Sequence, residues 1–101
     1  MTGRALKQHA MAQVLAGDTT LWYHLASVLV LAYLRRHGPC LLEEARGFCE
    51  RACLPPPHHP NAWGALAGRL SSTNAIEMTG VWQASADPRS HARLQPHWRT
   101  T

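Results

Sequence analysis

The chain has 101 residues, enough for one domain with a single hydrophobic core and too few for two. A hydrophobic fraction of 46% and four tryptophans are typical of a folded protein and argue against intrinsic disorder. The formal net charge of +4 fits contact with phosphates or with an acidic protein surface, although ordinary domains also carry such an excess. We therefore expect a single domain over residues 1–101.

The N-terminal part predicts two helices over residues 1–37. The first spans residues 4–16, and Gly17 ends it. The second runs to about His37 and has an inward face of Leu21, Leu25, Val28, Leu29 and Ala32, widened by Trp22, Ala26 and Tyr33. If these helices expose Trp22, Leu21 or Leu25, that strip would serve a homodimer or another protein partner.

Cellular location follows from the same region. Residues 1–20 lack the apolar core of a secretory leader, and the three cysteines are an odd count, so we expect a reduced cytoplasm. The most apolar stretch, residues 21–34, is shorter than the ~20 residues of a membrane span and contains His24 and Ser27. It is interpreted as a buried helix, with no membrane partner.

A pair of helices follows the Gly38-Pro39 break. Residues 41–52 form the first of the pair, and the proline run at 55–57 then forces a turn. The second begins at Pro60, where a missing amide hydrogen costs nothing. Its apolar residues Trp63, Leu66, Ala67 and Leu70 are spaced as one buried stripe, and we expect it to fray over residues 71–74.

From Ile76 onward the hydrophobic period is two, which predicts a β-hairpin. Two alternating runs are joined by a turn over residues 86–90. Trp82 and Trp98 lie on its apolar side, and we expect Trp63 and Leu66 to pack on Trp82 and Leu94. The opposite side is a polar, basic row of His91, Arg93, His97 and Arg99.

These elements predict an α+β, mainly α fold. Their order is that of a winged helix-turn-helix, with N-terminal helices at 1–37, the helix pair at 41–73 and a hairpin wing at 75–99. The turn within the pair, about six residues, is longer than in the tight form of the motif.

The segment HPNAWGAL at 59–66, the Thr79-Gly80 pair, and Ser90-His91-Ala92-Arg93 before Trp98 resemble small winged-helix proteins of bacteriophages and prophages. The resemblance covers roughly residues 40–99. The resemblance implies a winged-helix fold, a phage or prophage origin and a function that involves nucleic acids. It implies no catalytic residues. The chain departs from the family at residues 71–74, where a longer amphipathic helix is expected.

Metal binding and catalysis have little support. Cys49, Cys53, His58 and His59 offer two sulfurs and two nitrogens to a zinc ion, but the spacing is not that of common zinc fingers. The alternative is two structural cysteines and two solvent-exposed histidines. Paired carboxylates, a glycine-rich phosphate loop and a serine elbow are all missing, so we expect no cofactor and no enzymatic activity.

Nucleic-acid contact is the leading hypothesis, with double-stranded DNA as the partner. The outward face of the helix after Pro60 offers Asn61 for an adenine edge, Arg69 for guanine or phosphate, and Ala65 for close approach. The wing adds Arg89, Ser90, His91, Arg93 and Arg99 for phosphates. Alternatively, Asn61 caps its helix and the cations are solvated. The alternative function is a protein-interaction module, such as a phage adaptor or inhibitor that binds a host protein.

Overall fold

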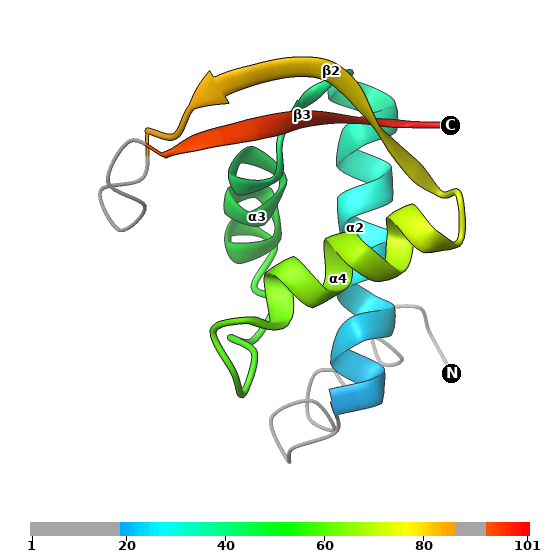
Figure 1. The fold of residues 1–101 in the computed structure, drawn as a ribbon. Helices are drawn as coiled ribbons and strands as arrows, with labels where there is room; N and C mark the ends of the chain where they lie inside the picture. The colour runs from blue at the N-terminus through cyan, green and yellow to red at the C-terminus, as the bar shows by residue number, and fades with distance from the viewer. Residues whose placement is uncertain (1–18, 87–92) are drawn as a thin grey trace.

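The computed structural model describes residues 19–86 and 93–101. The elements, in chain order, are α2 (Thr19–His37), β1 (Cys40–Leu41), α3 (Leu42–Arg51), α4 (Ala62–Ser72), β2 (Ile76–Ala84) and β3 (Leu94–Thr100) (Figure 1). The fold is α+β and mainly helical, as the sequence predicted. The helix predicted over residues 4–16 lies outside the described residues.

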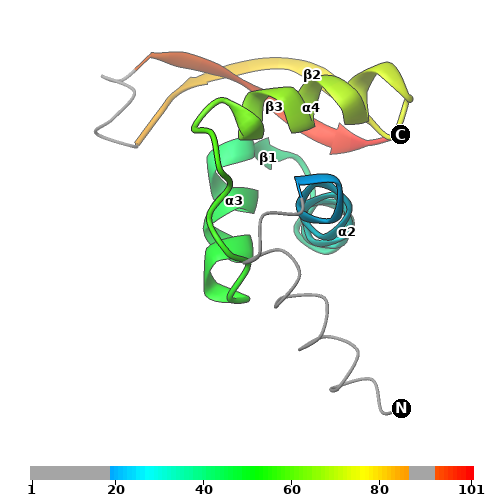
Figure 2. The same ribbon diagram turned by 90° about the horizontal axis from the view of Figure 1, so that it is seen from below.

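The helices and the sheet form two layers. α2 and α3 pack against each other, and the antiparallel hairpin β2–β3 crosses one end of this pair (Figure 1). Viewed from below, α4 and the hairpin lie on the same side of α2 and α3 (Figure 2). α4 contacts both α2 and β2, so it connects the helical layer to the sheet.

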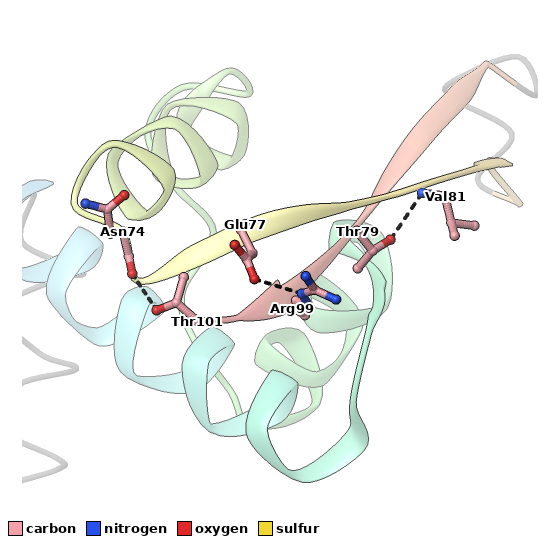
Figure 3. Close-up of polar contacts among 6 residues, drawn as sticks. All are labelled: Asn74, Glu77, Thr79, Val81, Arg99 and Thr101. Atoms are coloured by element: carbon pink, nitrogen blue, oxygen red, sulfur yellow. Dashed lines mark hydrogen bonds and ion pairs between the residues drawn. The ribbon is translucent and has the colours of Figure 1, made fainter.

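The sheet has three strands in the order β1-β3-β2, and β1 was not predicted. Cys40 of β1 and Met78 of β2 both pair with Trp98 of the central strand. The β2–β3 register is irregular between Met78 and Trp82. Gly80 has a φ of +89° there, a conformation that favours glycine. The Thr79 hydroxyl accepts the Val81 N–H at 3.2 Å and holds this bend (Figure 3).

The hairpin does not bury all of its predicted apolar side. Ile76 and Trp98 are buried, but Trp82 is 54% exposed and Leu94 is 62% exposed. The predicted packing of Trp63 and Leu66 on Trp82 and Leu94 is therefore wrong. Trp82 pairs with Pro96, so it does share a face with Trp98. The end of the hairpin at which β2 ends and β3 begins extends beyond α3, with no helix beneath it (Figure 1).

The core confirms one predicted helix face and corrects another. Trp63, Leu66, Ala67 and Leu70 of α4 are all buried, as predicted. In α2, however, the fully buried residues are Trp22, Ala26, Val30 and Leu34, whereas Val28, assigned to the inward face, is 54% exposed. This helix is apolar around most of its circumference, so its spacing did not define one face. Among the described residues, no helix is long and apolar enough to cross a membrane.

Trp22 connects α2 to the segment between α3 and α4. Its indole N–H donates a hydrogen bond to the Pro55 carbonyl at 2.8 Å. Its ring packs edge-on against Trp63, with centroids 5.1 Å apart and an interplanar angle of 81°. Because Trp22 is only 2% exposed, it is a core residue and not part of a free dimerisation strip.

Candidate nucleic-acid interface

The surface side of α4 carries small and polar side chains only. Opposite its buried stripe, the exposed residues are Gly64, Ala65, Gly68, Arg69 and Ser72, with Asn61 at the N-cap. The carboxylates of the described residues lie on α3 and β2, and α4 has none. A polyanion can therefore approach this helix face without meeting a negative charge on it.

Asn61 is placed at the start of α4 with its side chain exposed. Its backbone carbonyl accepts the Ala65 amide at 3.1 Å, and its own amide donates to His59 Nδ1 at 3.1 Å. The Asn61 side chain makes no capping hydrogen bond. Asn61 is therefore the N-cap residue of α4, but its side chain does not cap the helix and is exposed to solvent.

Arg69 is anchored by an aromatic ring of α2. Its guanidinium carbon lies 3.9 Å from the centroid of the Tyr23 ring, which is a cation–π contact. This contact was not predicted from the sequence, since the two residues are far apart in the chain. It restricts the arginine at the C-terminal half of α4 but keeps its positive charge at the surface.

The cations predicted for the hairpin differ in their surroundings. Arg93 is exposed just before β3. Arg99 Nε lies 2.8 Å from Glu77 Oε1, in a half-exposed ion pair that offsets its charge (Figure 3). Next to it, His97 shares a 2.7 Å hydrogen bond with Gln83, also across the strands. Arg89, Ser90 and His91 lie outside the described residues.

A groove of about 660 Å³ separates α4 from the hairpin. The first turns of α3 supply Glu43 and Arg46 to it, and Arg46 also pairs with Glu50 at 2.9 Å. The remaining lining comes from Leu41, Leu42, Trp63, Gly64, Ala67, Gly68, Ser71, Ser72, Met78, Ser85, Gln95, Pro96 and Trp98. Gly64, Gly68 and Ser72 of the candidate helix face border this groove, whereas Asn61, Ala65 and Arg69 are not among its lining residues. Sequence reasoning missed the groove because it depends on how three elements meet.

The glycines of α4 are not required by packing. A Cβ added at Gly68 would meet nothing within 4 Å. We predict that Gly68→Ala raises the free energy of unfolding by about 0.5–1 kcal/mol, because alanine loses less backbone entropy in a helix. Urea denaturation followed by circular dichroism measures this change. A lower free energy of unfolding in Gly68→Ala would mean that the added methyl group is not accommodated at the surface of α4.

The four metal candidates do not come together. Cys49 is fully buried in α3, whereas Cys53, with a φ of +66°, is exposed after the helix ends. Among the described residues, the Cys49, Cys53, His58 and His59 side chains form no group close enough to hold an ion. Burial raises the pKa of the Cys49 thiol to about 11.

This pKa predicts a loss of stability in alkali. The unfolded thiol ionises near 9.0 and the folded one near 11, so the unfolded state loses its proton first. The stabilising effect of the neutral thiol is complete below pH 9 and is lost as the pH rises toward 11. The free energy of unfolding should fall over this range on the order of 1–2 kcal/mol. Urea denaturation at pH 8 and pH 10.5 tests this. Between these two pH values, the free energy of unfolding of Cys49→Ala should fall less than that of the wild-type chain. An equal fall would contradict the raised pKa of Cys49.

The chain was also compared with known proteins. No protein-family model, curated protein or solved structure matches it.

Proposed function

We propose that the chain is a non-catalytic winged-helix protein that binds double-stranded DNA. In this proposal α3 and α4 are the helix-turn-helix pair, α4 is the recognition helix, and β2–β3 is the wing. The order of the elements supports this proposal. A further support is β1, the short strand before the helix pair, which joins the hairpin in a sheet ordered β1-β3-β2.

The observation that carries the proposal is the surface of α4. It is exposed, free of carboxylates, rich in small residues, and bordered by the hairpin across a groove. Asn61 would read an adenine edge with its uncommitted amide, and Arg69 would contact guanine or phosphate. Ala65 and Gly68 would let the helix backbone come close to the bases.

The wing would contribute phosphate contacts. Arg93 is exposed and Arg99 is half-exposed, and Arg89, Ser90 and His91 are assigned here from the sequence alone. Such contacts add affinity without sequence preference. Together with the resemblance to phage and prophage proteins, this suggests a role in regulation or replication in the cytoplasm of a bacterial host.

A second candidate function is protein binding, and a specific observation favours it. Met78, Val81, Trp82 and Leu94 are each at least 52% exposed, and all lie on the hairpin. Exposed large apolar side chains grouped on one element suit a protein partner better than a phosphate backbone. That partner would be a second copy of the chain or a host protein.

Titration of a labelled duplex at increasing salt concentration tests the first function. Steeply salt-dependent binding supports the DNA proposal. A stoichiometric protein partner that survives high salt and nuclease treatment, with no binding to duplex DNA, would support the second function instead.

A further inference from the structure

The turn between α2 and α3 gathers three side chains that can ligate a metal. His37 ends α2, Cys40 begins β1, and Glu44 lies in the first turn of α3. One ligand atom from each, an imidazole nitrogen, the thiol sulfur and a carboxylate oxygen, lies within 4.8 Å of the other two. Among the described residues, no other three histidine, cysteine, aspartate or glutamate side chains come this close.

The fold fixes the position of two of these groups. Gly38, with a φ of +92°, donates its amide to the Leu34 carbonyl at 2.9 Å, which ends α2 and turns the chain back on itself. The next strand then holds Cys40 opposite Trp98, with the cysteine 2% exposed. The arrangement brings the thiol beside the end of the helix that carries His37.

Aromatic stacking orients the imidazole. The His37 ring stacks on Tyr33 with centroids 4.9 Å apart and an interplanar angle of 18°. Tyr33 in turn stacks on Phe48 of α3, with centroids 5.2 Å apart. The stack joins α2 to α3 next to the cluster and limits the rotation of the His37 ring. The Glu44 side chain is exposed and can adjust to an ion.

The ligand types select the metal. A thiolate with an imidazole and a carboxylate suits Zn²⁺, whereas Mg²⁺ and Ca²⁺ prefer oxygen ligands alone. A tetrahedral zinc ion at roughly 2.0–2.3 Å from each ligand sets the ligand atoms roughly 3.3–3.8 Å apart. Small movements of the exposed His37 and Glu44 side chains reach that spacing, and water would take the fourth position.

We propose that His37, Cys40 and Glu44 bind one zinc ion, which joins the end of α2 to β1 and the start of α3. On binding, the Cys40 thiol releases its proton to solvent as the Zn–S bond forms. The thiolate and the Glu44 carboxylate then offset the two positive charges of the ion. This proposal does not depend on DNA binding.

Zinc titration of the purified full chain against a chromogenic chelator tests the proposal. We expect one zinc ion per wild-type chain and an affinity at least about tenfold lower in both His37→Gln and Glu44→Gln. The matched controls are His24→Gln and Glu50→Gln, exposed residues of the same two helices, which should bind as the wild type does. Unchanged affinity in His37→Gln and Glu44→Gln would overturn the proposal.

Cobalt substitution identifies the sulfur ligand. The Co²⁺-loaded chain should show a thiolate-to-metal charge-transfer band in the near ultraviolet, retained in Cys53→Ser and absent in Cys40→Ser. Loss of the band in Cys53→Ser, with retention in Cys40→Ser, would contradict the assignment. Because Cys40 is buried, its variant could fail to fold, and the thermal midpoint then decides. Zinc should raise the thermal midpoint of unfolding of the wild-type chain and leave that of His37→Gln unchanged. An equal rise in both would reject the site.

Discussion

Replacing Trp22 with alanine should lower the free energy of unfolding by about 3–5 kcal/mol, the usual cost of removing a buried tryptophan. The side chain is 2% exposed, packs edge-on against Trp63, and donates a hydrogen bond to the Pro55 carbonyl. Its loss leaves a cavity and an unsatisfied acceptor at the junction of α2 with the proline run. Since small domains have a total stability of about 5–15 kcal/mol, this one change removes a large part of it.

The matched control for this prediction is Trp82→Ala. Trp82 is 54% exposed at the overhanging end of the hairpin, so its removal should change the free energy of unfolding by no more than about 0.5 kcal/mol. Urea denaturation followed by circular dichroism compares the two variants. If Trp22→Ala unfolds entirely, Trp22→Phe keeps most of the ring and should lose about 1–3 kcal/mol. Equal losses in Trp22→Phe and Trp82→Ala would disprove the assigned core.

The largest functional effect is expected from Ala65→Glu, which places a carboxylate in the middle of the exposed face of α4. If this face lies against DNA, the new charge opposes the phosphates and blocks close approach to the bases. Like charges brought together in an interface cost several kcal/mol, so affinity for duplex DNA should fall on the order of 100-fold. Fluorescence anisotropy with a labelled duplex measures this loss.

Val28→Glu is the control for the change in net charge. Val28 is 54% exposed on α2, so a glutamate there alters the total charge equally without entering the face of α4. Its affinity for duplex DNA should fall only slightly. Equal losses in the two variants would show that overall charge, and not the α4 face, determines binding. Both variants should keep the wild-type circular dichroism spectrum, because each new side chain points to solvent.

The sequence predicted those elements whose periodicity was unambiguous. The stripe of Trp63, Leu66, Ala67 and Leu70 faces the core as its spacing requires. The hairpin also alternates as predicted, with Trp82 and Trp98 on one face. Alternation identifies the side of a strand but not what covers that side, so the exposure of Trp82 at the overhanging end could not be predicted.

Other features depend on contacts between distant residues. β1 is only two residues long and has no detectable period, so only its pairing with β3 reveals it. The contact of Arg69 with Tyr23 and the grouping of His37 with Glu44 depend on how helices pack and how the Gly38 turn directs the chain. The inward face of α2 was rotated in the prediction because apolar residues occupy most of that helix.

The central claim, that α4 and the hairpin form a DNA-binding surface, is tested most directly by duplex affinity as a function of salt. The logarithm of the association constant should fall linearly with the logarithm of salt concentration, with a slope of about −0.9 for each phosphate neutralised. Arg93→Ala should make this slope less steep by about 1. Absence of binding at low salt, or binding that salt does not weaken, would contradict the claim.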